Sequence, residues 1–593
     1  MRFLLWFFAV IGFFSVVILG LLIYATVSLF SAVRTNIAVL PEAIPASTVL
    51  RLDLDRAIGE QPQPFAQFFD DKVPSFNAVL TALKRGAADD RVKGLVARTG
   101  GVTLGLGQVQ ELRDAVKAFR AKGKFAYAFG ETFGEIGGGT RSYYAASAFD
   151  QIWIQPTGSL ALVGLQAEIP FFKGTLDKIG VEAQFERRAE FKSAATQFTE
   201  TKLPATDREA ESAMLASLYD QIVAGIADGR SLSPDAVKQL IDGGPYIIQA
   251  ALDKHLIDKI GYRDEVEAAA RDKAGPGSTL MDVVDYVGAS QVAETGTEVV
   301  ALIRALGEIN SGSSDDNPFG DSETVGADTM ARALNEAAKD PEVKAIILRI
   351  DSPGGSGTAS ETIWRAVKRA QQAHKPVIVS MGNVAASGGY YIAAGADKIV
   401  ADPATLTGSI GVFAGKFVTA GLFDKLGITV DTLSYGRDAG IDSGQTEFTP
   451  DQLVHFKAML DDFYHSFVAR VAEGRHLDPV VAEGLARGRV WTGQQAKERG
   501  LVDVLGGFEE AVRQAKAAAQ LPVDGPVILR TFPKPRSTFD KLIAGFDAAP
   551  DQGSRTLGLL QRLSVLAPLL HRLDQLDQAR RGGAVMQPID ITD

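Results

Sequence analysis

The chain has 593 residues, of which 46% are hydrophobic and 22% are charged, and its formal net charge is -11. This length is too great for a single hydrophobic core and predicts several domains. The negative charge, with no basic stripe interleaved with aromatic residues, argues against nucleic acid as a partner. The chain contains no cysteine, which excludes disulfides, thiolate nucleophiles and cysteine-based metal sites.

The chain begins with a long apolar run. Residues 3–32 contain no charged side chain, and about twenty apolar residues are enough to cross a bilayer. The apolar region of a cleaved signal peptide is shorter, about 7 to 15 residues. We therefore expect residues 1–34 to form an uncleaved single-pass transmembrane anchor. Signal-anchor logic places the remainder outside, on the periplasmic side of a bacterial inner membrane, although the flanking Arg2 and Arg34 do not settle the orientation.

The rest of the chain is internally repeated. Residues 142–150 resemble residues 389–397 at an offset of 247 (390 − 143), and the same offset aligns Gly164 with Gly411. Each repeat is as large as a domain, so the pattern indicates a tandem duplication and not a solenoid. We expect four segments after the anchor: a first half at 45–273, a linker at 274–298, a second half at 299–525, and a C-terminal tail at 526–593 to which no role is assigned.

The two halves show the same order of predicted elements. Each has a strand, a helix and a buried strand, followed by further strand–helix pairs: 49–54, 76–87 and 94–98 in the first half, and 299–302, 329–338 and 345–350 in the second. Alternating strands and helices predict parallel βα units, and hence an α/β fold. A long helix with a capping box is expected to begin at Thr206 in the first half and at Thr449 in the second.

One predicted turn in the second half places a serine among small residues. The apolar residues 376–380 predict a buried strand, residues 390–394 predict a helix, and Ser387 lies between them among small residues. A serine at a strand-to-helix turn exposes its hydroxyl, as in the nucleophile elbow of hydrolases. However, Ala385 stands where that motif has its first glycine, and small residues also serve simply to pack a helix onto a strand. By itself this stretch leaves both interpretations open.

The differences between the duplicates are more informative. At the offset of 247, Ser387 faces Thr140 and Gly388 faces Arg141, so the first half lacks the Ser-Gly-Gly sequence. The Pro-Gly-Gly turn that contains Gly354 and Gly355 is also confined to the second half. Consecutive glycines after a strand either make a plain turn or direct backbone N–H groups toward an oxyanion.

A nucleophilic serine needs a base. None of the six histidines lies in a small-residue motif, which disfavours a Ser-His-Asp triad, whereas Lys192 lies among small residues and faces Ala439 in the second half. The first half thus lacks the serine, and the second half lacks the lysine. A lysine base must be neutral, and burial lowers the pKa of lysine from its usual value near 10.4. We expect Lys192 in an apolar cleft between the halves, next to Ser387, with Ser409 either orienting its amine or forming a structural turn.

At these residues the chain resembles the signal peptide peptidase A family in its long form. The resemblance covers residues 45–525 and the anchor, and the motifs that carry it are Asp351-Ser352-Pro353-Gly354-Gly355, Ala386-Ser387-Gly388-Gly389-Tyr390-Tyr391, Thr407-Gly408-Ser409-Ile410-Gly411-Val412 and Phe191-Lys192-Ser193-Ala194. The family consists of membrane-anchored Ser-Lys peptidases with a duplicated Clp-protease/crotonase-like α/β fold.

The resemblance implies roles for the residues singled out above. Ser387 would be the nucleophile and Lys192 the general base, and the N–H groups of Gly388 and of Gly354 or Gly355 would stabilise the oxyanion. It also implies a homotetramer on the membrane that degrades released signal peptides, without a metal or another cofactor.

Two other functions remain possible from the sequence. The same fold class serves acyl-CoA chemistry, although an outward-facing, membrane-anchored location suits such an enzyme poorly. A membrane-anchored scaffold with a decayed site is the second alternative. Random drift has no reason to leave one complementary Ser387 and Lys192 pair in opposite halves, which argues against decay.

Overall fold

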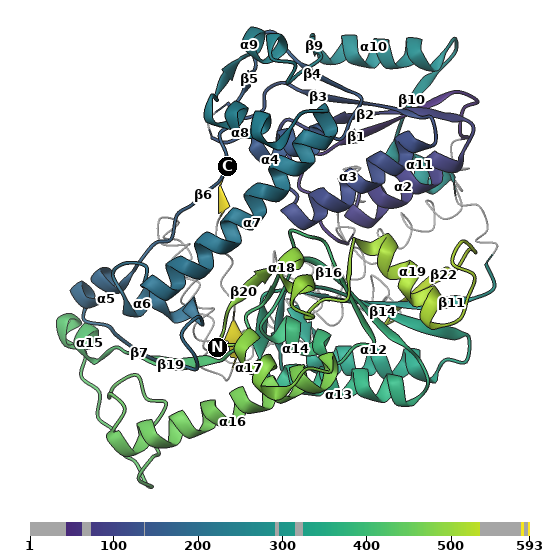
Figure 1. Cartoon of the computed structure of the whole chain (residues 1–593). Coiled ribbons are helices and arrows are strands. Elements are labelled where there is room, and N and C mark those ends of the chain that lie inside the picture. The colour runs from purple at the N-terminus through teal and green to yellow at the C-terminus, as the bar shows by residue number, and fades with distance from the viewer. Residues whose placement is uncertain are drawn as a thin grey trace, which may run out of the picture.

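The computed structural model describes residues 43–61, 73–135, 137–290, 296–314 and 324–533, and the backbone of 583–585 and 591–592. The predicted anchor, residues 1–34, lies outside these residues. Within the described ranges, the structure contains no helix of sufficient length and hydrophobicity to cross a membrane. The described chain forms two α/β halves, one above the other in Figure 1.

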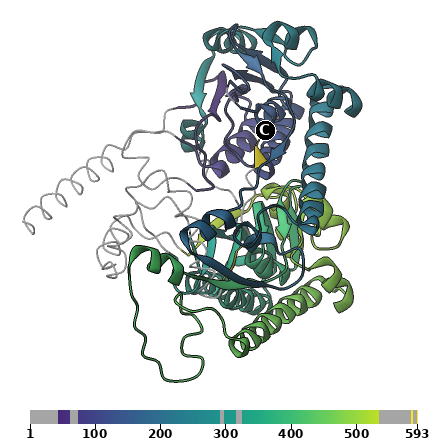
Figure 2. The same cartoon turned by 90° about the vertical axis from the view of Figure 1, so that its left-hand side faces the viewer.

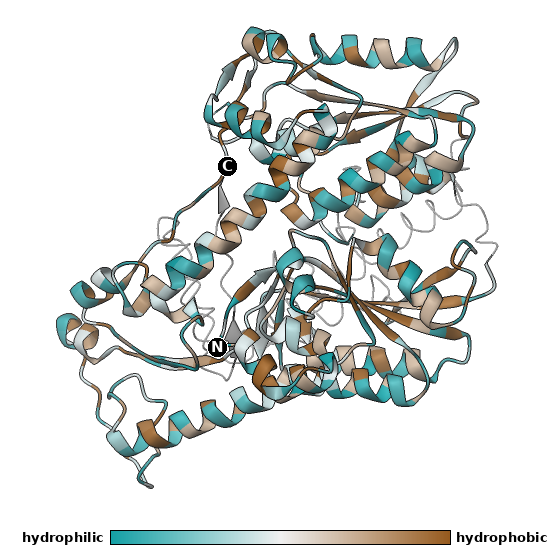
Figure 3. Ribbon diagram, viewed as in Figure 1, coloured by the Kyte–Doolittle hydropathy of each residue, from teal (hydrophilic) through white to brown (hydrophobic). Residues whose placement is uncertain are grey.

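The first half is built on a six-stranded sheet in which every pairing is parallel. In spatial order its strands are β10 (Thr279–Asp282), β1 (Thr48–Asp53), β2 (Val92–Arg98), β3 (Phe125–Gly130), β4 (Gln151–Ile154) and β9 (Lys259–Ile260). The central strands are apolar along most of their length because helices cover both faces of a parallel sheet. Figure 3 shows these strands as brown segments inside teal and brown helices.

The second half repeats this order. Its matching strands are β22 (Ile528–Phe532), β11 (Val299–Leu306), β14 (Val343–Ser352), β16 (Val377–Ala386), β17 (Lys398–Ala401) and β21 (Val504–Leu505). The end of β16 bends away from β17 and pairs with β18 (Leu406–Gly408), which pairs antiparallel with β20 (Val490–Thr492). The shared strand order agrees with a tandem duplication.

Helices connect and cover the strands of each half. In the first half the principal ones are α2 (Phe76–Ala88), α3 (Leu106–Ala121), α4 (Thr140–Ala146), α7 (Ala205–Arg230), α8 (Pro234–Asp242), α10 (Arg263–Ala274) and α11 (Val283–Ala289). In the second half they are α12 (Ala327–Lys339), α13 (Gly357–Gln372), α14 (Gly388–Ala394), α16 (Pro450–Arg475), α17 (Pro479–Leu485), α18 (Gly493–Glu498) and α19 (Phe508–Ala518).

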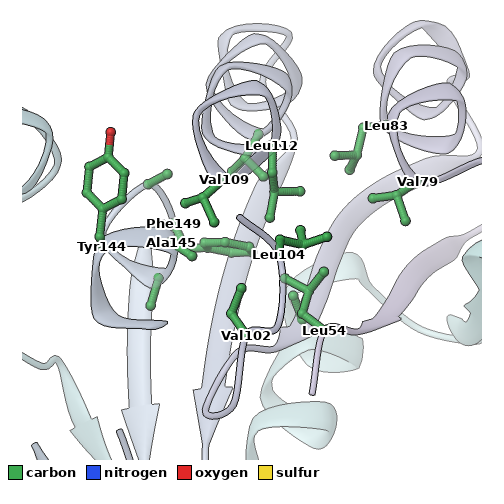
Figure 4. Packing of buried hydrophobic residues seen from close by; sticks show 14 of the residues in the cluster. Leu54, Val79, Leu83, Val102, Leu104, Val109, Leu112, Tyr144, Ala145 and Phe149 are labelled. Atoms are coloured by element: carbon green, nitrogen blue, oxygen red, sulfur yellow. The ribbon is translucent and has the colours of Figure 1, made fainter. Parts of the chain in front are cut away.

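One large hydrophobic cluster contains residues of both halves. Helix α19 packs on β14, β16 and β17 of its own sheet, and its Phe508 and Val512 belong to the same buried cluster as Val109 and Leu112 of α3. Figure 4 shows part of this cluster, where side chains of α2 and α3 meet those of the first half's loops and α4. Burial of this shared surface stabilises the relative placement of the halves.

Two predicted boundaries change. The predicted linker 274–298 is not merely a connection, because 279–282 form β10 at the edge of the first sheet and 283–289 form α11, which packs on α2. The predicted tail 526–593 likewise begins inside the second half, since 528–532 form β22. Short strands at a sheet edge depend on pairing with residues far away in the chain, which local sequence patterns do not reveal.

Of the two predicted capping boxes, the structure confirms one and not the other. At α16, the Thr449 side chain accepts from the backbone N–H of Gln452 and the Gln452 side chain accepts from that of Thr449, which confirms this box. At α7 the cap residue is Pro204 and no side chain caps the helix, so the prediction at Thr206 is wrong. Glu209, three residues after Thr206, forms an ion pair with Arg489 of the second half.

A two-stranded ribbon joins the halves a second time. Strand β7 (Glu182–Arg187) of the first half pairs antiparallel with β19 (Phe413–Val418) of the second. Next to it lie α5 (Lys173–Ile179) and α15 (Ala420–Leu426). After α15, residues 427–449 form a projecting arm, which Figure 2 shows as a green loop extending from the second half.

Candidate active site

Ser387 forms the whole turn between β16 and α14. The strand continues through residues 382–386, beyond its predicted end at residue 380, and ends at Ala386. Ser387 then has φ 53° and ψ −119°, a conformation that is rarely adopted by non-glycine residues and is common at functional sites. Its N–H donates to Gly408 O at 2.9 Å. This is the strand–turn–helix geometry of a nucleophile elbow, made without the leading glycine.

Lys192 reaches Ser387 because of the ribbon between the halves. Strand β7 is held on β19, and five residues later Lys192 lies against the second half. The preceding residue, Phe191, donates its N–H to Arg487 O at 3.0 Å. A Cβ on Gly488 would lie only 2.4 Å from Lys192 N, so the close backbone approach requires glycine there.

The Lys192 amine has three oxygen neighbours. Nζ lies 3.0 Å from Ser387 Oγ, 3.0 Å from Ser409 Oγ and 2.9 Å from Ser409 O. A neutral amine has two N–H donors and one lone pair. It can therefore donate to the two oxygens of Ser409 and accept from the Ser387 hydroxyl, so that each of the three contacts is a hydrogen bond.

Burial allows a large fraction of the Lys192 amine to be neutral near pH 7. Lys192 is 1% exposed, and this burial lowers the pKa of its amine to about 7. Compared with an exposed lysine, the fraction of neutral amine at pH 7 is larger by roughly a thousandfold. General bases are most effective when their pKa is near the operating pH.

Ser409 lies beside the Lys192 amine. Its φ is 50°, and its N–H donates to Arg489 O at 2.8 Å. This conformation presents both its carbonyl and its hydroxyl to the same amine. Of the two interpretations left open for Ser409, the structure favours contact with Lys192 over a merely structural turn.

The glycines of the Pro-Gly-Gly turn form a short strand beside Ser387. Strand β15 (Gly354–Ser356) follows β14 directly. A Cβ on Gly354 would lie 2.8 Å from both Ser387 Cβ and Gly388 N, and a Cβ on Gly388 would lie 3.2 Å from Gly355 N. The N–H of Gly354 donates to Ser352 Oγ at 3.2 Å. The N–H of Gly354 is therefore engaged by Ser352, and the backbone nitrogen of Gly355 lies close to Gly388.

The corresponding positions of the first half lack this chemistry. Thr140 occupies the place of Ser387 at the start of α4, and its Oγ1 accepts from the N–H groups of Val163 at 3.3 Å and Gly164 at 3.2 Å. Ala439, the counterpart of Lys192, is exposed in the arm. The described chain thus brings one serine–lysine pair together, and it does so across the halves.

Some positioning residues were missed by the sequence interpretation. The 487–489 segment holds both Phe191 and Ser409 through its carbonyls, and Ser352 engages the N–H of Gly354. The only sequence signal at 487–489 is a glycine soon after a helix, which is too common to indicate a site.

Two stretches of the chain, residues 118–276 and 369–522, match the family model described as peptidase family S49. The chain belongs to peptidase family S49. The paired match also agrees with the two structural halves, one carrying Lys192 and the other Ser387.

Two relatives are similar over most of the chain, and a third is similar over one third of it. The chloroplastic serine protease SPPA of Arabidopsis thaliana is 31% identical over 83% of this chain and 72% of its own length. Protease 4 of Salmonella typhi is 34% identical over 75% of this chain and 72% of its own. The protein named putative signal peptide peptidase SppA of Enterococcus faecium is 37% identical over 33% of this chain and 56% of its own.

Family membership decides among the broad functions. The chain is a serine peptidase, and its substrates are peptides. The acyl-CoA alternative finds no support in these relatives. A decayed scaffold is also disfavoured, because a buried amine remains 3.0 Å from the serine hydroxyl.

Proposed function

We propose that this protein is a membrane-anchored serine endopeptidase that degrades released signal peptides and other apolar peptides, with Ser387 as nucleophile and Lys192 as general base. The observation that carries the proposal is the buried contact between Lys192 Nζ and Ser387 Oγ, made by residues from different halves. A lysine base needs no acidic partner, and burial is the cause of its lowered pKa.

The reaction has two stages. Ser387 Oγ attacks the scissile carbonyl carbon while the neutral Lys192 amine accepts the hydroxyl proton, and the resulting ammonium gives that proton to the departing amine. The first product leaves with the new amino terminus. Lys192 then takes a proton from a water molecule, which attacks the acyl-enzyme ester, and the proton returns to Ser387 Oγ as the ester bond breaks.

The negative oxygen of each tetrahedral intermediate needs hydrogen-bond donors. We assign this role to the N–H of Gly388 together with that of Gly355. Gly388 is the first residue of α14, where a backbone N–H has no acceptor within the helix. Removing one such donor typically costs about 100- to 1,000-fold in kcat.

Substitution of the two reactive residues tests this assignment. Purified full-length protein in detergent is assayed on a fluorogenic apolar peptide, with Ser387→Ala and Lys192→Met beside wild type. We expect each variant to lose on the order of 1,000-fold or more in kcat while keeping its melting temperature or gaining stability. Lys202→Met, which changes an exposed lysine of the same segment, is the matched control. Full hydrolysis by either reactive-site variant would overturn the dyad.

The membrane location rests on the sequence of the N-terminal segment. Residues 3–32 carry no charge, and we propose that they anchor the peptidase in a bacterial inner membrane with the catalytic halves on the periplasmic side. Such a location suits apolar peptides released within the bilayer, because their hydrophobic residues keep them close to the membrane.

The internal duplication supports a homotetrameric ring. Residues 429–434 of the arm are the duplicate of β7, and residues 166–171 are the duplicate of β19, at the offset of 247. Within one chain β7 pairs with β19. Several large apolar residues of the arm are instead exposed: Ile428, Val430, Leu433 and Tyr435.

We infer that residues 429–434 of one copy pair with residues 166–171 of the next copy. This contact between copies would repeat the pairing of β7 with β19 that joins the two halves of one chain. A head-to-tail contact of this kind closes into a ring when its rotation allows, and the family resemblance suggests four copies.

A further inference from the structure

One helix of the first half has no cap residue of its own that can accept a hydrogen bond. Helix α3 begins after Gly105, which offers no side chain to the free N–H groups of the first turn. Its counterpart in the second half is α13, which begins after Ser356, at an offset of 251 (356 − 105). There the Ser356 hydroxyl accepts the N–H of Ala359 at 3.3 Å. The duplicated helices thus differ at their caps.

The second half supplies the missing cap. Asn383 of β16 reaches the first turn of α3, where its Oδ1 accepts the N–H of Gln108 at 3.1 Å. Its Nδ2 donates to Gln108 Oε1 at 2.8 Å, so two hydrogen bonds join the same pair of residues. A Cβ on Gly105 would lie only 2.3 Å from Asn383 Oδ1, so glycine at the cap position makes room for the asparagine. In Figure 1, α3 lies on the side of the first sheet that faces β16.

The same asparagine lies in a bulge of the strand that leads to the nucleophile. The register of β16 against β14 shifts here, so that residues 382–384 lie opposite Asp351. Asp351 Oδ1 accepts the N–H of Val384 at 3.0 Å, and Asp351 Oδ2 accepts from Asn383 Nδ2 at 3.3 Å. Within its own sheet, Asp351 therefore holds the bulge, and across the contact between the halves α3 holds it. Ser387 follows Asn383 by four residues.

The placement of the halves matters for the reaction because the dyad spans them. Lys192 belongs to the first half and Ser387 to the second, with 3.0 Å between Nζ and Oγ. The β7–β19 ribbon holds the segment that carries the lysine on the second half. Asn383 makes the reverse contact, since it holds the strand before the serine on a helix of the first half. A displacement of about 1 Å in a reacting group is enough to lower a rate by about 100-fold.

We propose that Asn383 is a positioning residue for the peptidase reaction. By capping α3 from the other half, it holds β16, and with it Ser387, where Lys192 can accept the hydroxyl proton. This inference rests on the proposed function in taking Ser387 and Lys192 as the reacting pair. Asn383→Ala should lower kcat by about 10- to 100-fold and leave KM unchanged, because the groups that bind the peptide remain.

A helix cap also stabilises the fold, so the test must separate stability from positioning. Asn383→Ala removes the acceptor of the Gln108 N–H and should also lower the melting temperature, by about 1 to 3 °C. Adding Gly105→Ser gives α3 a cap of its own, because φ −67° and ψ 163° at this position suit a capping serine. The Asn383 atoms that a Cβ at position 105 would meet are absent in this double variant.

The full-length protein in detergent is assayed on a fluorogenic apolar peptide and its melting temperature is measured beside it. For Asn383→Ala with Gly105→Ser, we expect the melting temperature to return to that of wild type while kcat stays about 10- to 100-fold low, because the new cap has no link to β16. Recovery of kcat together with the melting temperature would overturn the proposal, since stability alone would then explain the loss.

The matched control removes a cap from the neighbouring helix. Ser75 caps α2, where its hydroxyl accepts the N–H of Ala78 at 3.3 Å, and α2 packs on α3. Ser75→Ala should lower the melting temperature by a similar amount and keep the wild-type kcat, because α2 makes no such contact with the nucleophile strand through its cap. A loss of kcat in Ser75→Ala as large as that in Asn383→Ala would also overturn the proposal.

A second measurement does not depend on peptide hydrolysis. A fluorescent alkyl fluorophosphonate labels the serine when Ser387 Oγ attacks phosphorus, fluoride departs and Lys192 accepts the hydroxyl proton. We expect the rate of labelling to fall by the same factor as kcat in Asn383→Ala and in the double variant. This loss in a protein that hydrolyses no peptide would support the positioning role and refute the proposed endopeptidase function. Hydrolysis and labelling at wild-type rates in Asn383→Ala would refute the positioning role and leave the proposed function supported.

Discussion

At the scale of single residues, the site depends on one amine that is kept out of water. Lys192 has no carboxylate among the causes that set its pKa, and burial alone lowers the value to about 7. Ser387 and Ser409 supply its polar contacts. A buried, unpaired lysine costs stability and is retained where its neutral form is needed.

This environment predicts the pH dependence of the reaction. Below about pH 7 the Lys192 amine is protonated and has no lone pair for the Ser387 proton, whereas above that pH it is neutral. We therefore expect kcat/KM to rise about tenfold per pH unit on the acid side and to level off above about pH 7. The measurement is a pH–rate profile of the wild-type protein between pH 5 and pH 9 on a peptide without ionisable groups. A profile that is flat or falls with rising pH would show that Lys192 is not the base.

At the scale of elements, the β7–β19 ribbon determines which groups meet. It carries Lys192 from the first half to Ser387 in the second. The duplicate of β7 in the arm, residues 429–434, has no equivalent partner within the described chain, and its Leu433 is 94% exposed. β7 pairs within the molecule, whereas its duplicate at residues 429–434 remains available to a neighbouring copy of the chain.

The arm therefore predicts the oligomeric state. Leu433→Asp with Tyr435→Asp should reduce the detergent-solubilised protein to single chains, because the substitutions place one charge in the proposed contact and one directly after it. The fold itself should be unaffected, since Tyr435 is 99% exposed. Size-exclusion chromatography with light scattering provides the mass. Val480→Asp, on α17 and also exposed, should retain the wild-type mass. A wild-type protein that is itself a single chain would refute the ring.

At the scale of the whole molecule, a buried charge cluster crosses the boundary between the halves. Arg349 of β14 lies 2.7 Å from Glu60 and 2.7 Å from Glu111, both of the first half. Asp402, after β17, is fully buried next to Glu111, and burial raises the pKa of both carboxyls. Neither oxygen of Asp402 has a donor when both groups are ionised. The raised pKa values predict that one proton is shared between Asp402 and Glu111, which would supply the missing hydrogen bond.

That proton makes stability depend on pH. The unfolded chain releases it above about pH 4, whereas the folded chain retains it because the pKa values of Glu111 and Asp402 are raised. Folded stability should thus decline as the pH rises above about 4, until the folded state also loses the proton. Asp402→Asn removes the ionisable group, so its melting temperature should exceed that of wild type at pH 8 by more than at pH 5.

Thermal unfolding of the full chain in detergent, followed by tryptophan fluorescence, measures the difference. Asp90→Asn changes an exposed carboxyl and should leave the wild-type pH dependence intact. If Asp402→Asn melted at a lower temperature than wild type at pH 8, the charged form of Asp402 would instead stabilise the contact between the halves.

Local and repeated patterns in the sequence determined the duplicated sheets, their central strands and the two residues that the site needs. The duplication predicted two similar sheets, and the complementary loss of Ser387 and Lys192 between the halves predicted a site that needs both. Apolar runs identified the central strands because a parallel sheet buries both faces. These features are readable because each depends on residue types at a fixed spacing.

The tertiary structure alone decided the rest. The edge strands β10 and β22 form only by pairing with strands more than two hundred residues away in the chain. The lowered pKa of Lys192 comes from its burial against the second half, and the N–H of Gly354 is engaged by Ser352. Pairing, burial and backbone direction are properties of contacts between distant segments, and spacing along the chain does not encode them.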